Sequence, residues 1–171
     1  MPTEYIPVKP FAKKFGSIFG AYSILVLVML YTLNEDAGVV ISLLNFIITV
    51  AIVWYAIHLY KIDNNGLIDL TSSIKLGLAI GVIGGLMYGI YTYLHYNLVD
   101  PEYILEMRSN MEAEMEAQIL QQQMSEDEAE MTRSMSSVFA SPFVLATTGL
   151  ISIVFKTFVV GLIVGFIKRN N

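Results

Sequence analysis

The sequence contains no cysteine and a single tryptophan, and long parts of it carry no charge. The absence of cysteine excludes disulfides, iron–sulfur clusters and thiol chemistry. Charged residues make up 15% of the 171 residues and hydrophobic residues 55%, so the chain is more apolar and less charged than a typical soluble domain. The charge is missing mainly from four long runs, and these runs decide the fold class.

The four apolar runs span residues 15–33, 39–60, 76–98 and 143–167. Each has about the 20 residues that cross a hydrocarbon core of about 30 Å, and in lipid such a run must be helical to satisfy its backbone groups. The first run follows three lysines like a signal peptide, but it is too long and lacks a cleavage site. We predict an all-α integral membrane bundle of four transmembrane helices, a single membrane domain over residues 1–171.

The basic residues predict how the bundle is oriented. Seven flank one side of the runs and two lie on the other, so the positive-inside rule places both termini in the cytoplasm. Twelve acidic residues lie on the outer side, which therefore accounts for the net charge of -5. Basic residues this few, placed at the membrane edge, argue against nucleic-acid binding. The seven are Lys9, Lys13, Lys14, Lys61, Lys75, Lys168 and Arg169, and the two are Arg108 and Arg133.

The outer segment, residues 100–141, has signals for two short helices. Asp100 before Pro101 is a favoured helix start, and Ser125 with Glu128 fits a capping box. An apolar stripe at steps of three or four indicates an amphipathic helix. Its methionines could hold copper(I), but their spacing spreads the sulfurs along the helix and favours packing on the membrane or on a partner. The stripe is Ile104, Met107, Met111, Met115 and Ile119.

Glycines recur every four residues in three of the runs. Small residues at this spacing let helix backbones approach closely in a membrane. Four of them in the third run predict that this helix is central, with the contacts either within one chain or between chains. The packing glycines are Gly77, Gly81, Gly85 and Gly89 in the third run, Gly16 and Gly20 in the first, and Gly161 and Gly165 in the fourth.

One lysine interrupts the last run. Lys156 lies 13 residues from Phe143 and 11 from Ile167, about 20 and 17 Å from the two ends of the run. A central lysine costs roughly 2.5–3.5 kcal/mol on the insertion scale, and no run contains a carboxylate to pair with it. We hypothesise that it points into the bundle toward Tyr88, with Ser152 and Thr49 nearby. The alternative is a neutral or hydrated lysine that only hydrogen-bonds two helices.

Several segments together resemble a known family. They are "KKFGSIFGAYS", "GLMYGIYTYLHYNLVDPEYI", "MSEDEAE" and "GLIVGFIKRNN". The chain is similar over nearly its whole length to the small four-helix bacterial membrane proteins called domain of unknown function 4199. The resemblance implies the inner membrane of a Gram-negative bacterium. It implies no activity, so no functional residue is carried over.

Three functions fit the sequence. The first is a non-catalytic structural or interaction protein that uses its acidic outer segment; its partners are the lipid bilayer and either further copies or a membrane or periplasmic protein. The second is an oligomeric small transporter or channel with Lys156 lining the path. The third, an intramembrane enzyme using Ser152 and Lys156, lacks a nucleophile elbow or HExxH motif. We expect the first, with no enzymatic activity, cofactor or metal.

Overall fold

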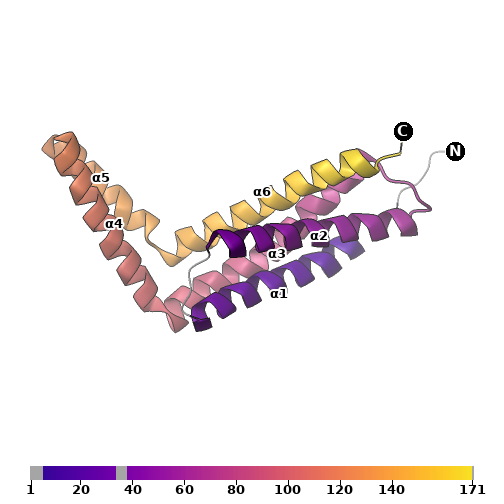
Figure 1. Cartoon of the computed structure of the whole chain (residues 1–171), viewed down its shortest axis with the longest axis horizontal. Coiled ribbons are helices and arrows are strands. Elements are labelled where there is room, and N and C mark those ends of the chain that lie inside the picture. Colours follow the sequence, from indigo (N-terminus) through magenta and orange to yellow (C-terminus); the bar gives the residue numbers. More distant parts are fainter. Residues whose placement is uncertain (1–5, 34–37, 171) are drawn as a thin grey trace. The chain divides into compact units, whose positions relative to one another are not determined.

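The computed structural model describes residues 6–33 and 38–170. These residues form helices and no strand, so the predicted all-α class is confirmed. In chain order the helices are α1 (Lys9–Leu33), α2 (Val39–Asp63), α3 (Leu70–Leu94), the π-helix η1 (His95–Val99), α4 (Pro101–Gln122), α5 (Glu126–Phe139) and α6 (Pro142–Lys168) (Figure 1).

Four helical segments are long and apolar enough to cross a membrane: Lys9–Leu33, Val39–Asp63, Leu70–Val99 and Pro142–Lys168. The chain is therefore a multi-pass membrane protein, as its four runs predict. The first and third helices begin six residues before the runs do. A run ends at its first charge, whereas helical backbone continues through lysine and serine into the interface.

The chain forms two compact units. Unit 1 comprises Met1–Tyr88 and Gly149–Asn171, and unit 2 comprises Gly89–Thr148. Unit 1 holds α1, α2 and the greater parts of α3 and α6, whereas unit 2 holds the end of α3, η1, α4, α5 and the start of α6. The single membrane domain expected from the sequence stays a prediction.

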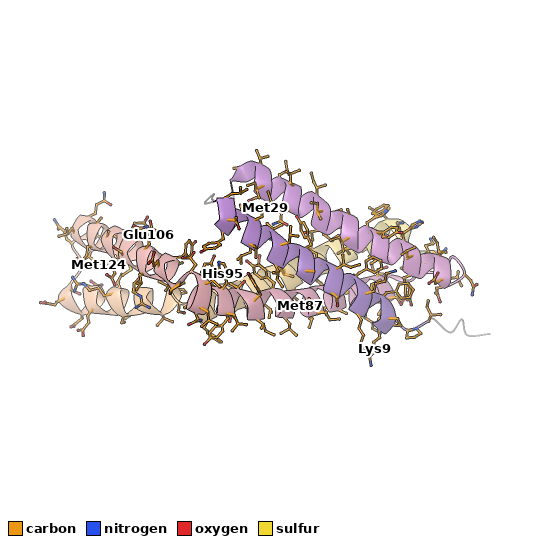
Figure 2. All side chains as sticks on the ribbon, turned by 90° about the horizontal axis from the view of Figure 1, so that it is seen from below. Lys9, Met29, Met87, His95, Glu106 and Met124 are labelled. Atoms are coloured by element: carbon orange, nitrogen blue, oxygen red, sulfur yellow. The ribbon has the colours of Figure 1, made fainter. Side chains whose placement is uncertain are left out.

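Unit 1 has a narrow core and a wide apolar exterior. Its core includes the fully buried Ile57, Leu76 and Ile80. Residues such as Leu25 and Val40 are largely exposed, and carbon-rich side chains stand out from α1 and α2 (Figure 2). An exposed surface of this kind suits lipid, because hydrocarbon solvates it without the cost that water would impose.

Unit 2 contains a helical hairpin, α4 and α5, and both helices begin at the predicted capping residues. The Asp100 carboxylate accepts a hydrogen bond from the Tyr103 amide at 3.3 Å, with Pro101 in the first turn of α4. The Glu128 carboxylate accepts from the Ser125 amide at 2.9 Å before α5. Gln123 between the helices has φ 49°, the left-handed conformation common after a helix. The two short helices predicted for residues 100–141 are confirmed.

Candidate functional site

Lys156 lies on the exposed side of α6 and does not point into the bundle as expected. The inward positions are taken by Ile153, Thr157 and Val160, all buried. They follow the steps of four and three that keep residues on one face of a helix. Lys156 is one residue, or about 100°, away from Thr157 on the helical wheel. The ammonium has no hydrogen-bond or ion-pair partner among the described residues.

The other three members of the hypothetical cluster have separate environments. The Tyr88 ring covers Gly149. A Cβ atom added at Gly149 would lie 2.7 Å from the Cε1 atom of Tyr88. Thr49 is buried on α2 and donates its hydroxyl to the Asn45 carbonyl at 2.7 Å. Ser152 is partly buried one turn before Lys156 on α6. No side-chain hydrogen bond or ion pair joins these four residues in the described chain, and their joint role stays a prediction.

The buried polar residue of α6 is Thr157, which the sequence analysis overlooked. It is fully buried, and its hydroxyl donates to the Ile153 carbonyl at 3.0 Å. Its side chain lies against Gly81 of α3, where an added Cβ would collide with the hydroxyl. A threonine whose hydroxyl bonds back to its own helix is inconspicuous in an apolar run, because it is satisfied locally.

Glycines form two seams along α3, both within one chain. On one side Gly77 faces α6, and its added Cβ would lie 2.9 Å from the Gly161 Cα. On the other side Gly84 faces α1, with an added Cβ 3.2 Å from the Gly20 amide nitrogen. Gly16, Gly85 and Gly165 also lie against α3 or its partner helices. Gly89 is buried in unit 2. Helix α3 is thus central to unit 1.

One end of unit 1 is fastened by side-chain hydrogen bonds, and we call it the tied end (Ile6, Tyr60, Asn64, Ile68 and Asn170). The Tyr60 hydroxyl donates to the Ile6 carbonyl at 2.8 Å, and the Asn64 carbonyl oxygen accepts from the Ile6 amide at 3.0 Å. The Ile68 amide donates to the Asn170 side chain at 2.8 Å. These bonds hold the segments before α1 and after α6 to the connection between α2 and α3.

Two lysines meet beside the tied end. The Lys61 ammonium donates to the Lys168 carbonyl at 2.7 Å, where a cation suits the negative end of α6. The Lys168 ammonium lies 4.3 Å from the centre of the Trp54 ring, within cation–π range. The next residue, Arg169, places its guanidinium 5.1 Å from the Phe166 ring. This end therefore gathers three cations and two aromatic rings.

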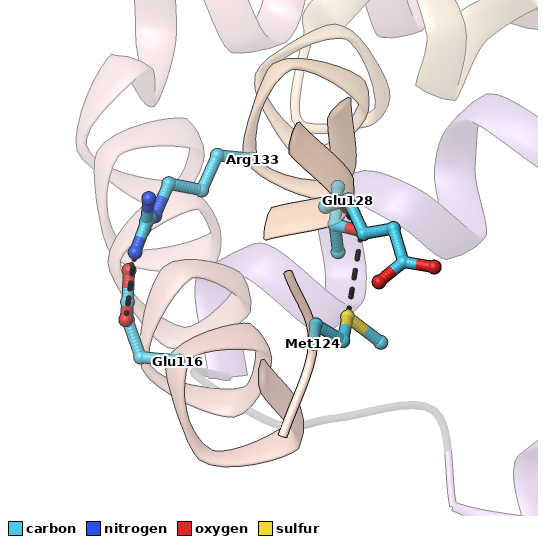
Figure 3. A network of polar contacts seen from close by, with 5 residues as sticks. Glu116, Met124, Glu128 and Arg133 are labelled. Atoms are coloured by element: carbon cyan, nitrogen blue, oxygen red, sulfur yellow. Dashed lines mark hydrogen bonds and ion pairs between the residues drawn. The ribbon is translucent and has the colours of Figure 1, made fainter. Parts of the chain in front are cut away.

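The predicted apolar stripe of α4 is buried or partly buried within unit 2. Ile104 and Ile119 of α4 are buried, as is Ala129 of α5, and the three stripe methionines are partly buried. Arg133 on α5 binds Glu116 on α4 with an Nε–Oε1 distance of 2.7 Å (Figure 3). Nine of the ten carboxylates between Asp100 and Glu130 are exposed. The hairpin therefore packs on itself and presents acids outward.

Two of these carboxylates have lowered pKa values. Hydrogen bonds from the Arg133 guanidinium and its charge stabilise ionised Glu116 and lower its pKa. Hydrogen bonds from the backbone and hydroxyl of Ser125 lower the pKa of Glu128. Both groups stay ionised at neutral pH, which keeps the acidic surface charged and the hairpin fastened.

A second overlooked feature is the aromatic group around η1. His95 is buried, with its ring 5.7 Å from that of Tyr91 and 5.2 Å from that of Tyr96. Tyr96 stacks on Tyr103 of α4 at 4.8 Å. A π-helix has no signal in the sequence, although the run of aromatic residues before Asp100 is visible there. This stacking joins the end of α3 to the hairpin within unit 2.

No group of three or more histidine, aspartate or glutamate side chains in the described part of the chain could hold a metal ion. The model of the family described as "Protein of unknown function (DUF4199)" matches residues 14–170. No curated protein and no solved structure matches the chain. The family match covers almost the whole chain, so the chain belongs to this family.

Proposed function

We propose that this member of the family is a non-catalytic membrane protein that binds a partner through the α4–α5 hairpin. The observation that carries the proposal is the burial of the apolar stripe of α4. An amphipathic helix that lay on the membrane would turn that stripe to the lipid. Here Ile104 and Ile119 of the stripe are buried within unit 2, its three methionines are partly buried, and nine of the ten carboxylates are exposed.

The charge of unit 2 indicates what the partner's surface carries. The unit has ten acidic and two basic residues, a net charge of −8. One of the two arginines is already paired with Glu116. A basic protein surface would be attracted by this field, and complementary charge speeds association and selects partners. We therefore propose a protein partner with a basic surface.

The location follows from the basic residues. With the seven cations in the cytoplasm, the hairpin lies on the outer side of the membrane. For a family found in Gram-negative bacteria this side is the periplasm, and the membrane is the inner one. A periplasmic or membrane protein is the partner that this arrangement favours.

Photo-crosslinking in native membranes tests the proposal. A photoreactive residue at the exposed Glu112 of α4 should give a discrete protein adduct, whereas one at the exposed Leu44 of α2 should react with lipid. The Glu112 adduct should weaken with rising salt and in Glu106→Gln/Glu114→Gln, which removes two exposed carboxylates and leaves the Glu116–Arg133 ion pair in place. The control Asp63→Asn removes an exposed carboxylate from unit 1 and should leave it unchanged. Lipid adducts alone at position 112 would refute the proposal.

The exposed position of Lys156 favours a second candidate, a path between copies. Its neighbours Phe155 and Ile151 are also largely exposed, so the ammonium belongs to the outer surface of the single chain. A charge there needs polar company that a further copy could supply. Anion flux in proteoliposomes should then vanish in Lys156→Met and persist in Lys13→Met, which removes a charge outside the apolar run. Equal flux in all three proteins would exclude such a path.

A further inference from the structure

We propose that unit 1 binds the phosphate of an anionic phospholipid through Lys61, Lys168 and Arg169, with Trp54 and Phe166 contacting the lipid beside it. We call these five residues the lipid site. The inference rests on membrane insertion and does not depend on the hairpin or its partner. The site lies where α2 and α6 end.

The cations of the lipid site come from neighbouring helix ends. The Lys61 ammonium reaches the Lys168 carbonyl, so the end of α2 meets the end of α6, where Lys168 and Arg169 follow each other in the chain. Among the residues that the structure describes, no carboxylate forms an ion pair with any of the three. Like charges at neighbouring positions repel each other. A bound phosphate would reduce this repulsion and accept hydrogen bonds from the free N–H groups of the cations.

The three cations have N–H groups that are available as hydrogen-bond donors. The Lys61 ammonium has three N–H groups and uses one on the Lys168 carbonyl. The Lys168 ammonium lies over the Trp54 ring, and no described residue accepts a hydrogen bond from it. The Arg169 guanidinium is exposed beside Phe166. A phosphate could therefore bind these donors without breaking a hydrogen bond of the described chain.

An apolar surface lies beside the cations, and this surface favours a lipid over free phosphate as the ligand. Trp54 is 39% exposed, Phe166 52% and Ile167 64%. Trp54 precedes Lys61 by two helical turns, about 10 Å nearer the bilayer centre on the same face. Rings at this depth below a cation match the glycerol and upper chains of a lipid whose phosphate is at the interface.

The protein's only tryptophan, Trp54, provides the measurement. The full chain is reconstituted with phosphatidylglycerol or phosphatidylcholine brominated in the upper acyl chain, at equal mole fraction, and Trp54 quenching is recorded. We expect the brominated phosphatidylglycerol to quench more strongly. The preference should fall about fivefold for each cation removed in Lys61→Gln/Lys168→Gln.

The matched control is Lys13→Gln/Lys14→Gln. It removes the same charge near the same end of unit 1, and Lys14 also lies over a ring, 5.5 Å from the centre of Phe15. This control should keep the preference within twofold. Equal quenching by the two lipids in the unchanged protein, or an equal loss in the control, would overturn the site.

Two further measurements separate the remaining outcomes. Inorganic phosphate added at constant ionic strength should leave the preference for phosphatidylglycerol unchanged; its loss would identify free phosphate as the ligand and overturn the lipid assignment. If circular dichroism shows that the double variant is unfolded, Arg169→Gln replaces it, because this exposed side chain makes no hydrogen bond within the described chain. An unchanged preference in Arg169→Gln would then contradict the proposal.

Discussion

Replacing Gly77 by alanine should separate α3 from α6. The new Cβ would lie 2.6 Å from the Thr157 carbonyl oxygen and 2.9 Å from the Gly161 Cα, and the third neighbour is the Gly161 amide nitrogen. All three are backbone atoms, so no side chain can rotate away. Ordinary contact begins near 3.4 Å. The two backbones must therefore move apart by several tenths of an ångström at this point.

The expected cost follows from two opposing effects. Overpacking a tight contact costs about 1–3 kcal/mol, and rigid backbone neighbours place this one in the upper half of the range. Alanine is about 1 kcal/mol more favourable than glycine in a helix interior. We expect Gly77→Ala to lower the free energy of unfolding by about 1–2 kcal/mol.

Reversible unfolding by sodium dodecyl sulfate in mixed micelles, followed by far-ultraviolet circular dichroism, measures this difference. Gly38→Ala is the matched control, because nothing lies within 4 Å of an added Cβ at the start of α2. Because Gly38 is the N-cap of α2, where alanine is less favourable than glycine, the control should lose no more than about 1 kcal/mol. A Gly77→Ala protein as stable as the control, or more stable, would refute the close seam between α3 and α6.

Three more predictions concern single contacts. Tyr60→Phe leaves the Ile6 carbonyl without its donor and should lower the free energy of unfolding by about 1–2 kcal/mol; unchanged proteolysis near the N-terminus would contradict it. Hydrogen-bond partners lower the pKa values of Glu116 and Glu128, so these carboxylates stabilise the hairpin at neutral pH. This stabilisation is lost as the pH falls through their folded-state pKa values, which lie below 4.5. NMR titration should show both pKa values rising toward 4.5 in Arg133→Gln/Ser125→Ala. Lys156→Met should leave the fold intact and raise the free energy of unfolding, since an unpartnered charge leaves the span; a clear loss of stability would show a partner for the ammonium.

The spans and caps could be predicted from the sequence because each depends on local chemistry. Twenty apolar residues specify a membrane helix wherever they occur, and Asp100 or Ser125 acts on an amide three residues away. The four-residue glycine spacing indicated close contacts but left their partners open. The structure places those contacts within one chain.

The direction of Lys156 could not be predicted because it depends on which face of α6 meets α3. Composition favours neither face, since α6 is apolar all round. The face is chosen by the fit of Thr157 and Gly161 against Gly81 and Gly77, a matter of shape between residues about 80 apart in sequence. The contact between Lys61 and Lys168 could not be predicted either, because it also depends on how the helices pack. The sequence places both lysines only on the same side of the membrane.

The seam between α3 and α6 can form only late in biosynthesis. Helix α3 is complete at Leu94, but its glycine face meets α6 only when residues up to Lys168 have been made. At translation rates of 5–20 residues per second this delay is roughly 4–15 s. During that time Ser73 and the glycines of α3 that pack on α6, such as Gly77 and Gly81, face lipid or the insertion machinery without their partner. Quality-control proteases that detect small or polar residues in lipid could thus distinguish unfinished chains from complete ones.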